Sequence, residues 1–402
     1  VCSAPMLSDR RFLIVALMAA CGALAPIALQ IVVPVLPYMR ADLGTSIADT
    51  QWTVTGFSAA LGISMLVIGP LADRYGRRPL LIGGMLLFTA GSLLAWLAPD
   101  LNWLVAGRIV QAIGAGAAST IGRVVAADLF AGADLGKVFA YMTMAMVIGP
   151  MVAPVLAGLM ADQWGWRSIL LLLLLLGAAF TLLTISRVPE TGSAEERPAD
   201  ASWTEALAGG RLFFYLATLT ATQIGIYALI SASPYIVVEL LGHSATEYGL
   251  YFVVLTLGFL GGNFLSTRIA HRLGPDRTIV LGLLVFAGAW AALAWSLSRP
   301  EWSAWALFAP GTVLGGCNGL IQPNCHAAAM NGAGAAKGTA ASLSGFTQVM
   351  AGATGLQLMA WLQPGQVDPG AMVRVIGWSA AAAVIMAILF LLRANTRKAA
   401  TV

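Results

Sequence analysis

The chain has 402 residues, of which 59% are hydrophobic and only 10% charged, and its formal net charge is +4. A soluble domain carries roughly 25% charged residues, so this composition excludes a soluble fold of this size. Inside a bilayer every backbone polar group needs an internal partner, which leaves helices or closed barrels. Unbroken apolar runs such as 169–176 lack the alternation of barrel strands and therefore predict helices.

A helix needs about 20 mainly apolar residues to cross a membrane. In chain order the sequence predicts twelve such spans, at 12–38, 50–71, 80–98, 102–127, 137–160, 166–186, 212–241, 246–270, 277–297, 303–330, 338–363 and 370–392. We therefore expect an all-α integral membrane protein with twelve transmembrane helices.

The first span begins like a secretory signal, because Arg10 and Arg11 precede an apolar stretch. The apolar run continues past Cys21 to Pro37, which is too long for the apolar region of a signal, and further spans follow. We expect a retained first helix.

Residues 187–210 form the longest polar stretch and predict a cytoplasmic linker. The linker separates an N-terminal bundle of six spans, residues 1–186, from a C-terminal bundle of six, residues 211–402. A weak internal echo supports a duplicated unit, since Arg74 and Gly76 recur 198 residues later as Arg272 and Gly274.

The distribution of basic residues predicts the orientation. Sixteen of the 22 Lys and Arg fall in loops on the side of the N-terminus, and that side is cytoplasmic by the positive-inside rule. The other side holds Arg40, Arg167 and Arg299, while three arginines lie within spans. We expect both termini in the cytoplasm, and the basic balance requires no nucleic-acid partner.

The loop after the second span reads Gly-Pro-Leu-Ala-Asp-Arg-Tyr-Gly-Arg-Arg-Pro over residues 69–79. This stretch closely resembles the signature of the major facilitator superfamily, whose fold is two pseudo-symmetric six-helix bundles. The carboxylate of Asp73 can pair with Arg77. It can also cap a helix N-terminus near Lys337, where the helix dipole favours an anion. The resemblance implies a latch between the halves, formed by Gly69, Asp73, Arg74, Gly76, Arg77 and Arg78.

The fourth span carries Arg108 within residues 104–114, a segment that resembles the second motif of the superfamily. In that motif the arginine is associated with proton coupling. A charged residue inside a span predicts a functional site. The alternative is a side chain that reaches the membrane surface, because Arg108 is only about two turns from the helix end.

The fifth span contains two prolines four residues apart, which bend a helix by removing hydrogen bonds. The segment resembles the superfamily motif that is associated with antiporters, and it implies a hinge and seal between the halves at Gly149, Pro150, Pro154 and Gly158. This motif favours export over import.

Residues 227–235 and 247–250 are similar to the bicyclomycin- and chloramphenicol-resistance subfamily of drug/proton antiporters. That subfamily usually has an acidic residue in the first span before a Pro-x-x-Pro sequence. Here Gln30 stands at that position, before Pro34 and Pro37. Because Gln cannot titrate, the usual proton carrier is missing.

No Asp or Glu lies near the middle of the membrane, whereas Arg108, Arg123 and Arg374 lie within predicted spans. A cavity that Arg108 or Arg123 faces would favour an anionic, zwitterionic or neutral polar solute. Proton coupling then falls to Arg108, Asp128 or His326, since histidine exchanges a proton near neutral pH. Polar side chains in the spans complete the candidate cavity: Gln30, Arg123, Gln223, Tyr227, Ser231, Asn318 and Gln322. In the tenth span Asn318, Gln322 and His326 recur every four residues and could share a face.

Other classes of function find little support. No HExxH or GxSxG sequence occurs, three scattered histidines make no metal site, and residues 332–338 lack the pattern of a phosphate-binding loop. We expect no enzyme activity, no cofactor and no metal. The expected partners are a small-molecule substrate, protons and the lipid bilayer of a bacterial inner membrane, with the protein as a monomer. An importer of the same fold stays open as the alternative.

Overall fold

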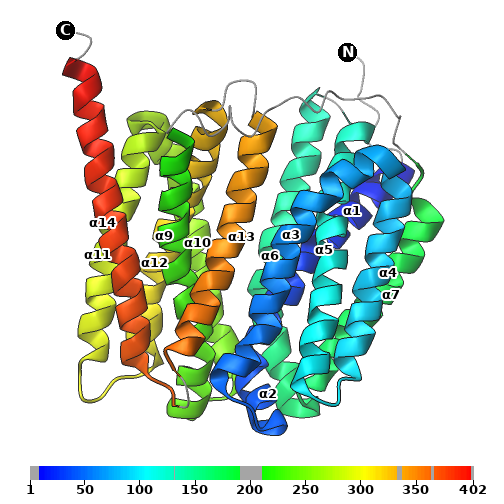
Figure 1. Ribbon diagram of the computed structural model, residues 1–402, viewed down its shortest axis with the longest axis horizontal. Helices are drawn as coiled ribbons and strands as arrows, with labels where there is room; N and C mark the ends of the chain where they lie inside the picture. The colour runs from blue at the N-terminus through cyan, green and yellow to red at the C-terminus, as the bar shows by residue number, and fades with distance from the viewer. Residues whose placement is uncertain (1–8, 131, 191–210, 333–336, 364–365, 400–402) are drawn as a thin grey trace. The chain divides into compact units, whose positions relative to one another are not determined.

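A computed structural model describes residues 9–130, 132–190, 211–332, 337–363 and 366–399. Within these ranges nearly every residue is helical and no strand occurs (Figure 1). The all-α architecture that the apolar runs predict is confirmed.

The chain forms two compact units, the first made of residues 1–39 and 52–197 and the second of residues 40–51 and 198–402. The boundary crosses two elements, the short α2 (Leu36–Leu43) and the long α3 (Ile47–Tyr75). The other long helices of the first unit are α1 (Asp9–Gln30), α4 (Arg77–Trp96), α5 (Leu101–Leu129), α6 (Gly132–Trp164) and α7 (Arg167–Arg187).

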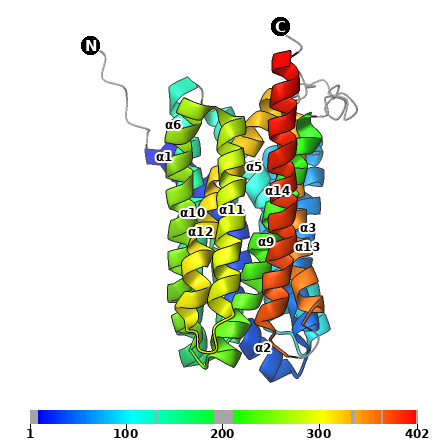
Figure 2. The same cartoon turned by 90° about the vertical axis from the view of Figure 1, so that its left-hand side faces the viewer.

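The second unit also consists of long helices (Figure 2). Its helices are α9 (Arg211–Tyr235), α10 (Ala245–Leu273), α11 (Pro275–Leu297), α12 (Ala304–Gly332), α13 (Lys337–Trp361) and α14 (Pro369–Ala399). A short π-helical segment, Ile236–Leu240, extends α9 beyond Pro234. In this unit α12 packs between α10 and α11, and α9 packs against α13 and α14.

Eleven helical segments in the described part of the chain are long and apolar enough to cross a membrane. They correspond to eleven of the twelve predicted spans. The remaining helix, α13, is 25 residues long and also contains Thr347, Gln348 and Gln357. These polar side chains lower its hydropathy and distinguish it from the other helices.

Glycines bring pairs of helices into backbone contact within each unit. A Cβ atom on Gly91 of α4 would lie 2.2 Å from the backbone nitrogen of Gln111 in α5. In the second unit, a Cβ atom on Gly262 of α10 would lie 1.9 Å from the carbonyl oxygen of Gly316 in α12. No other residue fits at such distances, so these glycines fix how closely the paired helices pack.

The two glycines of the internal sequence echo have the same backbone conformation. Gly76 separates α3 from α4 with φ 88° and ψ 160°, and Gly274 separates α10 from α11 with φ 80° and ψ 161°. This region of backbone space is essentially restricted to glycine. The match gives the echo a physical reason, because each unit needs the same sharp turn between its second and third spans.

We expect Gly76→Ala to destabilise the protein by about 1–3 kcal/mol, because alanine is strained in this backbone conformation. The added methyl group would also lie 3.1 Å from a carboxylate oxygen of Glu190. Gly83→Ala is the matched control, because Gly83 is inside α4 with no atom within 4 Å of the added carbon. The melting temperature of the purified protein in detergent measures both effects. Equal melting temperatures for Gly76→Ala and the wild type would contradict the strain.

Candidate functional site

The side chain of Arg108 in α5 is completely buried at the centre of a polar cluster in the first unit. Its Nε donates to the carbonyl oxygen of Thr53 at 3.2 Å, and its terminal nitrogens donate to the carbonyl oxygen of Ala28 at 2.8 Å and to Oε1 of Gln111. The guanidinium carbon also lies 4.1 Å from the centre of the Phe57 ring. The planar guanidinium therefore joins α5 to α1 and α3, because its nitrogens donate hydrogen bonds to both helices.

The sequence explains why this place can hold an arginine. The helix α1 ends at Gln30, four residues before Pro34, which has no N–H to donate back to it. Carbonyl oxygens near this end lack helical partners, and a cation at a helix C-terminus is favourable. Arg108 supplies both the donor and the charge at Ala28. Because Arg108 is buried, the alternative of a side chain that reaches the membrane surface is wrong.

The contacts of Arg108 are all with neutral groups. Among the described residues no carboxylate lies within ion-pair distance of it. Gln111 extends the cluster, since its Nε2 donates to Oγ of Ser92 in α4 at 2.7 Å. The centre of the first unit therefore retains a positive charge, held in place by dipoles and a π system.

Two other predicted cavity residues of this unit lie outside this bonded cluster. Gln30 ends α1 two residues after Ala28 and is half-buried. Arg123 lies four turns after Arg108 on α5 and is exposed. Its guanidinium donates within its own helix, to the carbonyl oxygen of Ser119 at 3.2 Å and to Oγ of Ser119 at 3.3 Å.

A carboxylate that the sequence reasoning missed lies at the latch motif. Glu190 follows α7, and its side chain accepts hydrogen bonds from the backbone N–H groups of Arg77 at 3.0 Å and of Arg78 at 3.3–3.4 Å. It thereby caps the N-terminus of α4, where Gly76 has no side chain to do so. The signal was its position in a Pro-Glu pair at the start of the linker, on the same predicted side as the latch motif.

The arginines of the motif are arranged around this cap. Nε of Arg77 lies 3.2 Å from Oδ2 of Asp128, near the end of α5, and Arg78 donates to the carbonyl oxygen of Ile185 in α7 at 3.0 Å. The exposed Arg74 lies over the Tyr75 ring at 5.3 Å. The predicted contacts of Asp73 lie outside what the structure describes, as do the side chains of Lys337 and the environment of Gly69.

The antiporter-like segment lies inside α6. This helix runs through both Pro150 and Pro154 without ending. A Cβ atom on Gly149 would lie 2.7 Å from the Ile27 side chain, so this glycine lets α6 approach α1 of the same unit. Gly158 is buried. Gly149 therefore serves packing within the first unit, beside the α1 segment that binds Arg108.

In the second unit, three predicted cavity residues lie along α9. Gln223 is buried, and its Oε1 has no hydrogen-bond partner among the described residues. The Tyr227 ring covers Gly352 of α13, where an added Cβ would be 3.0 Å away. Ser231 lies 3.2 Å from the carbonyl oxygen of Leu356 and equally far from Oε1 of Gln51, which belongs to this unit.

The tenth-span residues Asn318, Gln322 and His326 lie on α12 and do not bond to one another among the described contacts. Asn318 is buried, and its Oδ1 has no hydrogen-bond partner in the described part of the chain, while Gln322 is half-buried. His326 bonds instead across to α13, with Nδ1 2.9 Å from Oγ of Ser344 and Nε2 2.8 Å from Oε1 of Gln348. Because an amide oxygen only accepts, Nε2 carries a proton and donates to Gln348.

Comparison with known proteins agrees with this architecture. Residues 18–356 match the Major Facilitator Superfamily. The chain is 27% identical to multidrug resistance protein D of Escherichia coli K12, over 88% of this chain and 90% of that protein. It is 24% identical to a bicyclomycin resistance protein homolog of Haemophilus influenzae, over 82% of this chain and 84% of that protein.

Solved structures share the fold. A bacterial homolog of the human lysosomal transporter Spinster aligns with a TM-score of 0.78 and 16% identity, over 97% of this chain and 98% of that one. The xylose transporter XylE of E. coli aligns with a TM-score of 0.72 and 14% identity, over 94% and 98% of the two chains. The family match covers most of the sequence, including the latch motif, the Arg108 segment and the antiporter-like segment, and the chain belongs to the major facilitator superfamily of multi-pass membrane transporters.

Proposed function

We propose that this transporter exports a small anionic, zwitterionic or neutral polar molecule in exchange for protons. Relatives over most of the chain are named for multidrug and bicyclomycin resistance, which supports export. The antiporter-like segment in α6, with Pro150 and Pro154, supports the same direction. We further propose that both termini face the cytoplasm of a bacterial inner membrane, as the distribution of basic loops indicates.

The nature of the cargo follows from the charge of Arg108, which is the observation that carries this proposal. Its contacts neutralise no charge, because they are carbonyl oxygens, an amide and an aromatic ring. Like charges about 4 Å apart repel by about 4 kcal/mol at an effective dielectric constant of about 20. That energy corresponds to roughly a thousandfold in affinity, for a cation that comes within this distance of the guanidinium.

Proton exchange needs a group that titrates near physiological pH. Arg108 holds its charge there, and Gln30 cannot ionise. Two groups remain from the sequence reasoning, and Asp128 is already engaged with Arg77 at 3.2 Å. His326 is half-buried between the hydroxyl group of Ser344 and the amide group of Gln348. Protonation would change Nδ1 of His326 from an acceptor to a donor in its hydrogen bond with Ser344. We therefore place the exchanged proton at His326.

The test is transport by the purified protein in liposomes with an imposed pH gradient. We expect carboxylates, hydroxamate chelators and phenicols to move in the direction opposite to the protons. The pH of the lumen should therefore change when one of these solutes is present. Lipophilic cations should be moved far less. His326→Gln should retain solute exchange at equal pH but lose uphill transport. Strong transport of lipophilic cations by the wild type would overturn the cargo class, and solute movement in the direction of the protons would overturn antiport.

A further inference from the structure

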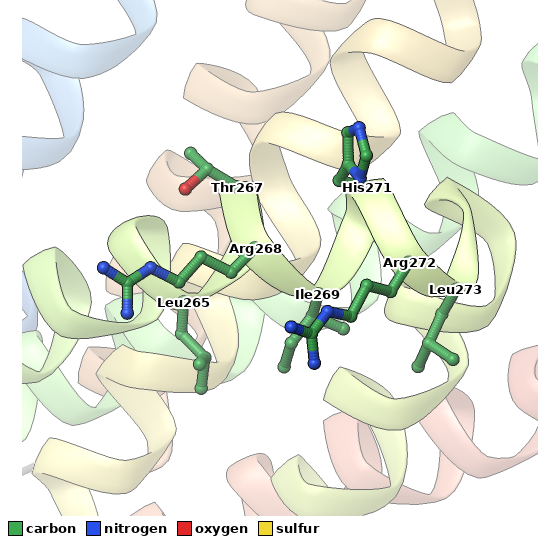
Figure 3. A pocket seen from close by; sticks show the side chains of 7 residues that line it. All are labelled: Leu265, Thr267, Arg268, Ile269, His271, Arg272 and Leu273. Carbon is green, nitrogen blue, oxygen red and sulfur yellow. The ribbon is translucent and has the colours of Figure 1, made fainter.

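The end of α10 in the second unit carries a basic pocket that lies outside the candidate site described above. The pocket has a volume of about 870 Å³ and is lined by Arg268, His271 and Arg272 together with the apolar Leu265, Ile269 and Leu273 (Figure 3). It lies just before Gly274, at the turn that corresponds to the latch turn of the first unit.

Arg74 and its counterpart Arg272 are both exposed, but the surroundings of the two turns differ. In the first unit Arg77 lies beside Asp128, and Glu190 caps the next helix. In the second unit no ion pair involves Arg268 or Arg272 within the described part of the chain, and both side chains are exposed. Two exposed guanidinium groups therefore lie at the end of a helix that is long and apolar enough to cross a membrane.

The neighbouring side chains determine what kind of anion fits. Arg268 and Arg272 are four residues apart and so lie next to each other on one face of the helix. Leu265 precedes the two arginines on that face and Ile269 lies between them, and Figure 3 shows both on the side opposite His271 and Thr267. The Phe264 ring, which is 61% exposed, lies 4.5 Å below the Arg268 guanidinium. A ligand that matches this face has an anionic head and an apolar tail.

We propose that this face binds an anionic phospholipid from the surrounding leaflet. The phosphate oxygens accept hydrogen bonds from Arg268 and Arg272, whose planar groups suit a phosphate. One acyl chain lies along Phe264, Leu265 and Ile269. A free phosphate ion would gain the charge contacts but would leave the apolar part of the face uncovered, which is why a lipid fits better.

The experiment measures lipid binding to the full-length protein in detergent by native mass spectrometry during titration with phosphatidylglycerol. Removing two arginines near a membrane surface should weaken binding about 30-fold, so Arg268→Gln/Arg272→Gln should retain far less lipid. The matched control is Arg167→Gln/Arg299→Gln, which removes two arginines that are each stacked on a neighbouring tryptophan. The control should bind phosphatidylglycerol as the wild type does.

Three further measurements test whether the ligand is a lipid or a free anion, and whether the variants are folded. Phosphatidylcholine should bind much more weakly than phosphatidylglycerol, and equal binding would overturn recognition of the anionic head. Excess inorganic phosphate should not displace the lipid, and displacement would identify a free-anion site instead. Arg268→Lys/Arg272→Lys keeps both charges and should retain most of the binding. If the lysine variant folds and binds no better than the glutamine variant, the charge attraction proposed here is wrong.

Discussion

Arg108→Ala is expected to abolish transport and to destabilise the first unit by about 3 kcal/mol or more. The substitution leaves the carbonyl oxygens of Ala28 and Thr53 and Oε1 of Gln111 without their donor in a buried place. Each buried acceptor left unpaired costs about 1–3 kcal/mol. The melting temperature in detergent and solute exchange in liposomes measure the two parts of the effect.

Arg108→Lys separates charge from geometry. Lysine keeps the positive charge but cannot reach three acceptors with a planar fork, so we expect a loss of about 1.5–3 kcal/mol with insertion preserved. Arg123→Ala is the control for stability, because Arg123 is exposed and bonds only to Ser119 of its own helix among the described contacts. That change should stay within about 0.5 kcal/mol of the wild type. A normal melting temperature and normal exchange for Arg108→Ala would rule out the central role of this cluster.

The second large effect concerns the ion pair at the latch motif. We expect Arg77→Asp and Asp128→Arg each to impair transport and lower the melting temperature, since each places like charges where opposite charges lie 3.2 Å apart. Repulsion of about 4 kcal/mol is the scale for such a contact at an effective dielectric constant of about 20. The double variant Arg77→Asp/Asp128→Arg restores the attraction and should recover much of both properties.

The control uses an exposed pair of the second unit. Arg374 and Asp368 lie 3.0 Å apart with both side chains about half exposed, and such pairs contribute about 0–1 kcal/mol. Exchanging their charges one at a time should change little. If the single reversals at Arg77 and Asp128 cost no more than those at Arg374 and Asp368, the latch pair has no special role. Glu190→Gln then tests the neighbouring cap alone, at an expected cost of about 1 kcal/mol.

The spans were predictable because a long apolar run has few alternatives in a membrane, but their ends were not. The first predicted span, 12–38, is broken after Gln30, where Pro34 and Pro37 interrupt the helical hydrogen bonds and a short 3-10 turn intervenes. The seventh, 212–241, changes to a π-helix after Pro234. Hydropathy does not predict these changes in the type of helix, because they depend on single backbone hydrogen bonds.

Single residues of the candidate site, such as Arg108, were recognisable in the sequence, but the contacts of the site and the carboxylate of Glu190 were not. Arg108 was recognisable as a charge in an apolar run, whereas its acceptors on Ala28 and Thr53 are backbone atoms and carry no mark in the sequence. Glu190 is 113 residues from the N–H group of Arg77 that it binds. His326 shares a helical period with Asn318, yet its partners are set by the residues that α13 places opposite.

The neutral surroundings of Arg108 have an electrical consequence. In the described part of the chain the guanidinium is bound by dipoles and an aromatic ring and by no carboxylate, so we expect it to keep its charge throughout a cycle. Exchange of one proton inward for one monovalent anion outward then carries two positive charges inward. Each charge is worth about 2.3 kcal/mol per 100 mV of membrane potential, so a cell with a negative interior drives such export by its voltage as well as by its pH gradient. A neutral cargo would draw half as much from the voltage, and the ratio of the currents would reveal the valence of the solute.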